Sequence, residues 1–243
     1  MNRVAPPGAE GAALSAAAPL QPRSPSRELL GGIRARAPFV ALAVAALFAA
    51  APARADRKEI YTVLGFDAGA NGYKVPASGS GSTTAFAGGL DLGVYYGLTN
   101  TLHLGGRLRA TSTPDVQFDS VKLSMADGSE SVGSLFADHR SISLGAVGHY
   151  RFDTGRAFAP VVELEAGFAG HQYRRVEHVP AGAGFKIDLG NKSQNALYGA
   201  GALLLEYRFA NRWIAMTGIS VRAETGDMQP WSLSVPLRVG LIW

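Results

Sequence analysis

The chain ends in the stretch Trp231-Ser-Leu-Ser-Val-Pro-Leu-Arg-Val-Gly-Leu-Ile-Trp243, in which two kinds of side chain alternate. Successive side chains of a β-strand point to opposite faces, so the stretch separates into two sets. One face is mostly polar and carries Ser232, Ser234, Pro236, Arg238 and Gly240. The other face is entirely apolar, and its members are Trp231, Leu233, Val235, Leu237, Val239, Leu241 and Trp243. The stretch therefore predicts a strand between an apolar and a polar environment.

The same alternation recurs through the rest of the chain after residue 55, and no segment there keeps a helical period. Short connections centred on Asn100 and Asn211, and a third at 152–158, alternate with long polar segments at 69–84, 111–140, 171–195 and 224–230. Short turns at one end and long loops at the other are typical of transmembrane barrels. We predict strands at 60–68, 85–98, 102–110, 141–152, 158–170, 196–209, 213–223 and 231–243. The expected fold is all-β, an eight-stranded antiparallel up-and-down transmembrane β-barrel over residues 56–243.

The apolar face could meet lipid, or it could be the inside of a soluble barrel. Aromatic residues at the strand ends favour lipid, because two aromatic girdles mark the two interfaces of a membrane barrel. Phe86 and Tyr96 are ten residues apart, which at ~3.3 Å per residue and a tilt of about 40° gives a rise of roughly 25 Å. The girdle residues that we predict are Phe66, Phe86, Tyr96, Tyr150, Phe158, Phe168, Tyr207, Phe209, Trp213, Trp231 and Trp243.

The first 55 residues have the pattern of a leader. Arg34 and Arg36 precede an apolar run at 37–50, and Ala53-Arg54-Ala55 has the small-x-small form of a cleavage site. The run is short for a spanning helix, so a signal peptide for Sec-type export is favoured over an N-terminal membrane anchor. We expect cleavage after Ala55.

The basic excess of the chain belongs to this leader. Residues 1–55 contain six of the 23 Lys and Arg but two of the 19 Asp and Glu, which leaves 17 of each and a neutral domain. A nucleic-acid partner is therefore not expected. The chain has no cysteine, which excludes disulfides and cysteine-based metal sites.

The polar face of the predicted strands carries equal numbers of acids and bases. Charges inside a narrow barrel have to be paired, so we expect an interior network of ion pairs that plugs the lumen. Its predicted members are Asp67, Asp91, Arg107, Arg109, Arg151, Glu163, Glu165, Glu206, Arg208, Arg222, Glu224 and Arg238. The turn at 98–102 sets Asp91 opposite Arg109, and we expect these two to pair.

These features resemble the small eight-stranded outer-membrane barrels of the OmpA, OmpX and OmpW type in Gram-negative bacteria. The terminal Trp243 resembles the C-terminal signal by which such barrels are recognised for insertion. The resemblance implies an outer-membrane location, contact with outer-membrane lipid and lipopolysaccharide, and the barrel-assembly machinery as a partner. A monomer without an OmpA-type periplasmic domain is expected.

Three functions remain open. A structural or surface-interaction barrel is preferred, with a narrow channel for small hydrophobic or ionic solutes as the alternative. The third is a lipid A-modifying enzyme, because such barrels use a His-x-Ser pair and His139-Arg140-Ser141 has that form. Ser141 falls on the polar face, away from lipid, so no catalytic, cofactor or metal site is expected. The basic residues at 171–195 could contact lipopolysaccharide phosphates.

The mature protein is predicted to begin at Asp56, since Ala53-Arg54-Ala55 follows the apolar run. N-terminal sequencing of the membrane fraction tests this. A protein that retains residues 37–50 would show that the segment is an anchor.

Overall fold

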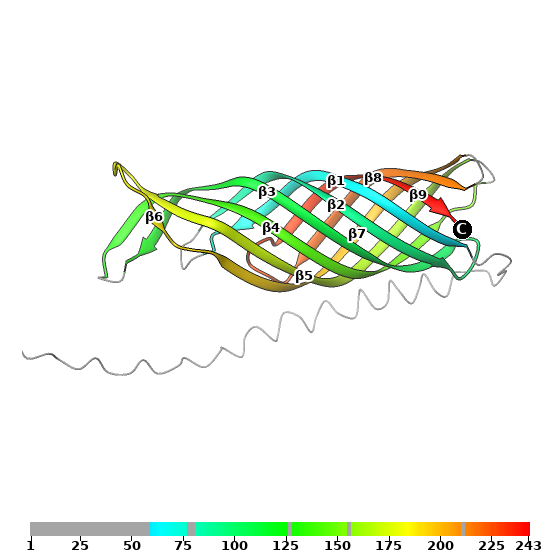
Figure 1. Cartoon of the computed structure of the whole chain (residues 1–243), viewed down its shortest axis with the longest axis horizontal. Coiled ribbons are helices and arrows are strands. Elements are labelled where there is room, and N and C mark those ends of the chain that lie inside the picture. Colours follow the sequence, from blue (N-terminus) through cyan, green and yellow to red (C-terminus); the bar gives the residue numbers. More distant parts are fainter. Residues whose placement is uncertain (1–58, 77–80, 126–127, 155–156, 210–211) are drawn as a thin grey trace, which may run out of the picture. The chain divides into compact units, whose positions relative to one another are not determined.

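A computed structural model describes residues 59–76, 81–125, 128–154, 157–209 and 212–243. The leader, including Ala53 and Ala55, lies outside the described residues. Nine strands are present in this part of the chain (Figure 1). They are β1 (Ile60–Lys74), β2 (Ser82–Gly97), β3 (Leu102–Ser124), β4 (Glu130–Arg151), β5 (Phe158–Pro180), β6 (Ile187–Asp188), β7 (Lys192–Phe209), β8 (Trp213–Glu224) and β9 (Trp231–Ile242).

Eight of these strands close into a ring, which confirms the predicted fold. Each strand pairs antiparallel with the next around the ring, β1 pairs with β9, and β5 pairs with β7. The two-residue strand β6 only adds to the side of β5, at Glu177 and His178. No helix long and apolar enough to cross a membrane occurs in the described residues.

The first short turn sets the register of its hairpin. The amide of Leu98 donates to the carbonyl of Leu102, and the Thr99 hydroxyl accepts from the amides of Thr101 and Leu102. The pairing that follows sets Asp91 opposite Arg109, as the turn predicts. Because the side-chain period of a strand is two, this register also decides which residues face inward.

Three of the four predicted long loops are wrong in part, and in the segment 69–84 β1 continues to Lys74 and β2 begins at Ser82. The segment 111–140 is largely strand, since β3 and β4 continue as a paired hairpin as far as Ser124 and Glu130. The segment 171–195 likewise contains the end of β5, all of β6 and the start of β7. β3, β4 and β5 have 23, 22 and 23 residues, whereas β8 and β9 have 12 each. One side of the barrel therefore extends far beyond the other (Figure 1).

Irregular pairing explains why the alternation of polar and apolar residues in the sequence did not predict this extension. The β3–β4 register shifts between Thr113 and Val116 and again between Phe118 and Val121. Asp115 and Ser120 lie at these shifts with positive φ, and each bulge reverses the inward and outward positions that follow it. Strict alternation is lost there, although the strand continues.

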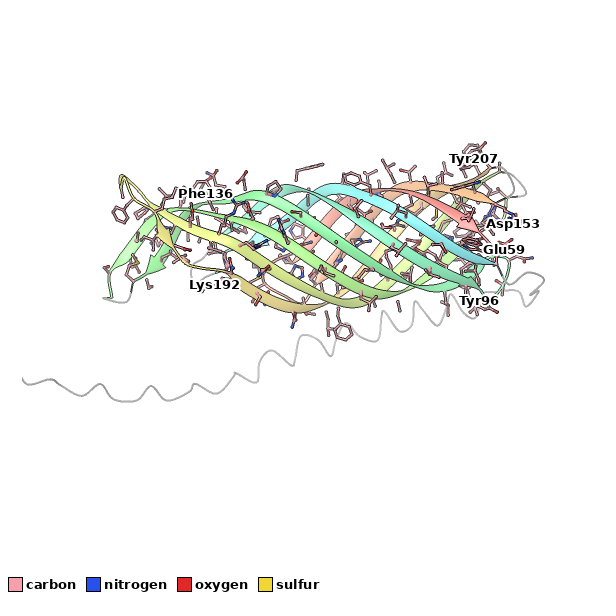
Figure 2. All side chains as sticks on the ribbon, in the orientation of Figure 1. Glu59, Tyr96, Phe136, Asp153, Lys192 and Tyr207 are labelled. Carbon is pink, nitrogen blue, oxygen red and sulfur yellow. The ribbon has the colours of Figure 1, made fainter. Side chains whose placement is uncertain are left out.

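The apolar face of the barrel points outward. Leu64, Leu203 and Phe168 are 63%, 69% and 72% exposed, and every second residue of β9 from Trp231 to Val239 is exposed. The side chains project from the outer wall around the barrel (Figure 2). Of the eleven predicted girdle aromatics, ten are exposed, and Tyr150 is half-buried against Phe152.

We predict that Leu237→Arg destabilises the folded barrel by ~2–4 kcal/mol, because this residue is exposed in the middle of the apolar band. Val132→Arg, also outward-facing but on the extension of β4, should have a much smaller effect. Unfolding free energies in lipid vesicles compare the two. Equal costs would contradict a lipid-facing Leu237.

Candidate functional site: the charged lumen

The inward face of the strands brings together all twelve residues of the predicted charge network. Eleven of their side chains are at most 10% exposed, and Arg208 is 26% exposed at the short-turn end. Each of the twelve has an oppositely charged partner within 4 Å. Since β-strands from all sides contribute, these ion pairs cross the lumen.

Glu163 on β5 lies at the centre of the lumen. Its Oε2 accepts from Arg107 on β3 at 2.7 Å and from Arg238 on β9 at 2.8 Å. Its Oε1 lies 3.1 Å from Nδ1 of His149 on β4 and accepts from the hydroxyl of Tyr95 on β2 at 3.2 Å. One carboxylate thus binds side chains from four other strands, and this compensates the cost of burying its charge.

A second carboxylate, that of Glu206, organises the short-turn end. Oε1 accepts from Nε of Arg151 at 2.9 Å and from Nε of Arg208 at 2.7 Å, and Oε2 lies 3.5 Å from His149. His149 therefore bridges Glu163 and Glu206 and joins the two groups of charged residues around them. Tyr61 stacks on His103 beside this cluster, with ring centroids 4.5 Å apart.

The remaining charges lie toward the extended end. Glu165 pairs with Arg107 at 2.7 Å and accepts from the Tyr198 hydroxyl at 2.5 Å. The guanidinium of Arg222 lies 3.7 Å from the centroid of the Tyr198 ring and pairs with Glu224 at 2.8 Å. The aromatic ring thus links two groups of ion pairs.

The predicted Asp91–Arg109 ion pair is wrong, although the two residues are opposite in register. Asp91 pairs with Arg238 at 3.0 Å, and Arg109 pairs with Asp67 at 2.8 Å. Long side chains in a closed barrel can reach across to strands that are not hydrogen-bonded neighbours. Arg238 lies on β9 and Asp91 on β2, with β1 between them. A prediction that considers only residues opposite each other on neighbouring strands could not identify this contact.

Histidine and tyrosine side chains complete the network, and the sequence analysis did not include them as members. His149, Tyr95 and Tyr198 contact the carboxylates, while His139 lies 3.1 Å from His171, which lies 2.6 Å from Glu224. The alternation of the sequence does indicate that these residues face the lumen, because each of them is at an inward position. It cannot show which charge each one contacts.

A small cavity lies inside the barrel among the described residues. This cavity of about 20 Å³ beside Asp67, Asn71 and Arg109 has room for about one water molecule. Above it, toward the extended end, an apolar cluster fills the interior, and the Tyr173 hydroxyl donates to the carbonyls of Lys74 and Met228. The cluster consists of Tyr73, Val75, Val116, Phe118, Val121, Leu123, Leu135, Ala137, Tyr173, Val176 and Met228.

The structure places His139 and Ser141 on the inner face of β4. Ser141 Oγ lies 2.6 Å from Oγ1 of Thr111, and the His139 ring packs against Tyr73, His171 and Tyr173. Both side chains are buried in the lumen. In the described residues, no three His, Asp or Glu side chains are placed to hold a metal ion.

The outward apolar band and the filled, charged lumen define an eight-stranded transmembrane β-barrel. Similar architecture occurs in Neisserial surface protein A, which is 12% identical with a TM-score of 0.47 over 75% of this chain and 95% of that chain. Ail, the attachment invasion locus protein of Yersinia pestis, is 12% identical with a TM-score of 0.45 over 77% and 99%. The outer membrane protein OprG from Pseudomonas aeruginosa is 12% identical with a TM-score of 0.40 over 78% and 97%. No protein-family model and no curated protein matches the sequence.

Removing one partner of a buried pair leaves an unpaired charge, so we predict that Asp91→Ala costs roughly 3–5 kcal/mol. Combining it with Arg238→Ala should recover part of this loss, because the two groups are 3.0 Å apart. Unfolding free energies of the four proteins in a double-mutant cycle give the coupling. The parallel cycle of Asp91→Ala with Arg109→Ala should give a smaller coupling, and the reverse order would refute this assignment.

Proposed function

We propose that this protein is an outer-membrane barrel with a closed lumen, acting in envelope structure or in surface interaction rather than in transport or catalysis. The observation that carries the proposal is the contact of Glu163 with Arg107, Arg238, His149 and Tyr95 across the interior. An eight-stranded barrel has an interior just wide enough for side chains to fill.

We infer the membrane orientation from the unequal ends of the barrel. The short turns would face the periplasm, and the extended ends of β3, β4 and β5 would face outward. Tyr96, Tyr207 and Asp153 lie at the short-turn end, and Phe136 lies on the extension (Figure 2). Trp243, 71% exposed at the end of the chain, would serve the assembly machinery as the insertion signal after Sec-type export.

The extension supports a role at the cell surface. β3 continues 14 residues past Ala110, to Ser124, which at ~3.3 Å per residue is about 45 Å of strand. Its outer face carries charged side chains, including Asp119, Lys122 and Glu177. We propose that this face, on a monomeric barrel, contacts lipopolysaccharide or another surface partner.

The closed interior argues against the channel and the enzyme. A solute would have to displace both the ion pairs around Glu163 and the apolar cluster around Tyr173. Ser141, which the His-x-Ser pattern would make the nucleophile, is 6% exposed and its side chain faces the lumen.

We predict that the folded protein shows no steady ion conductance in planar bilayers. The ion pairs around Glu163 and the apolar cluster around Tyr173 each block the lumen. Asp91→Ser with Arg238→Ser should therefore leave the barrel closed, because the apolar cluster remains. Phe118→Ser with Tyr173→Ser should also leave it closed, because the ion pairs remain. The variant with all four changes should conduct. Heat-modifiable gel mobility checks that each variant is folded. Steady conductance of the unchanged protein would reject the closed-barrel proposal in favour of the channel.

A further inference from the structure

A groove of about 830 Å³ lies on the outer wall, across β2, β3, β4 and β5. Two rows of outward side chains line it. Leu90, Ala110, Ile142 and Gly170 are register partners in the lower row. The upper row, one step toward the extended end, contains Gly88, Ser112, Arg140 and Gln172. The lower row is mostly apolar and the upper row is polar.

Small residues make the groove where the outer aromatic girdle is interrupted. The girdle at this end consists of Phe66 on β1, Phe86 on β2, Phe168 on β5 and Trp231 on β9. β3 and β4 contribute no aromatic residue to it within the groove, because Ala110 and Ile142 stand there. A lipid chain can therefore lie closer to the wall here than beside the aromatic rings.

The groove does not lead to a space for lipid inside the barrel. The β2–β3 pairing ends at Gly88 and Ser112, above which β2 pairs only with β1. Gly88, Thr111 and Ser141 line both the groove and the internal cavity, which has only about 20 Å³ and is polar. A bound chain would stay on the outer wall.

Two guanidiniums at the upper edge of the groove lie near a single carboxylate, that of Asp138, which is opposite Arg174 in register and is already bound by a third arginine. Arg140 on β4 and Arg174 on β5 are exposed on the outer face, and neither has an ion-pair partner within the described part of the chain. The nearby Asp138 is bridged by Arg175, whose Nε lies 2.8 Å from Oδ2. Burial alone would raise the pKa of Asp138, but the hydrogen bonds from Arg175 and the Asp115 amide, together with the charges of Arg175 and Arg140, hold it below its usual value.

These observations fit one kind of ligand. Arg140 is opposite Gln172 in register, and Arg174 is two residues further along β5, so the two arginines are diagonal neighbours, ~7–8 Å apart. Three arginines around the one carboxylate of Asp138 leave an excess of positive charge, and guanidiniums bind phosphate oxygens strongly. The apolar row lies directly on the membrane side of them.

We propose that the groove is a binding site for one phosphorylated, acylated lipid of the outer leaflet. Its phosphate lies on Arg140 and Arg174, and an acyl chain lies over Ala110 and Gly170. This site rests on the proposed membrane orientation. It specifies where the proposed contact with lipopolysaccharide is made.

Native mass spectrometry of the folded protein released from detergent tests the site with diphosphoryl lipid A as the probe. We expect one bound molecule, and binding about tenfold weaker for the same lipid without phosphates. Inorganic pyrophosphate alone should bind much more weakly, because it lacks the acyl chain. Equal binding of lipid with and without phosphate, or of pyrophosphate and lipid, would overturn the proposal.

Two pairs of variants separate the site from general effects. Arg140→Gln with Arg174→Gln should weaken lipid binding about tenfold, while Lys74→Gln with Arg212→Gln removes two exposed charges elsewhere and should not. Gly170→Phe should fill the groove, since a Cβ there meets Asn195 Oδ1 at an ordinary 3.5 Å. The control Gly199→Phe lies on the outer face of β7, where a Cβ meets nothing within 4 Å.

Loss of binding in both control variants as well as in both site variants would overturn the proposal, as would unchanged binding in the site variants. The result is independent of conductance. If the barrel conducts ions and binds lipid at Arg140, the closed-lumen proposal is wrong and the lipid-site proposal stands. If the barrel is closed and does not bind lipid there, the lipid-site proposal is wrong and the closed-lumen proposal stands.

Discussion

The burial of Glu163 is the constraint on which the interior of this barrel depends. A carboxylate on the inner wall cannot be left without donors, because an uncompensated buried charge costs several kcal/mol. Its donors come from β2, β3, β4 and β9, so satisfying one side chain fixes the relative positions of five strands. The packing of the lumen is therefore decided by charge as well as by volume.

The outer wall follows a different rule. In the described residues, its strands are hydrogen-bonded to their neighbours around a closed ring, which is a condition for a sheet to cross a lipid bilayer. Its side chains need only be apolar, and they differ in size from Gly170 to Phe168. This freedom allows local shape to vary, and the outer wall can carry a groove without disturbing the charge network inside.

The sequence predicted the ring of eight strands because an alternating pattern depends only on local geometry. It predicted both the inward positions of Asp91 and Arg109 and their register, because the turn at Asn100 fixes them. It failed on the partners of these residues, since Arg238 reaches Asp91 past an intervening strand. The extension of β3 was missed because bulges at Asp115 and Ser120 interrupt the alternation.

The position of Arg238 on the final strand has a consequence for how the barrel closes. Until β9 docks between β1 and β8, neither Asp91 nor Glu163 has this guanidinium as a partner. A slip of one residue would turn Arg238 toward lipid, and a slip of two would move it ~7 Å along the wall, beyond the reach of both carboxylates. These ion pairs of Arg238 therefore favour one register of β9 against its two neighbours.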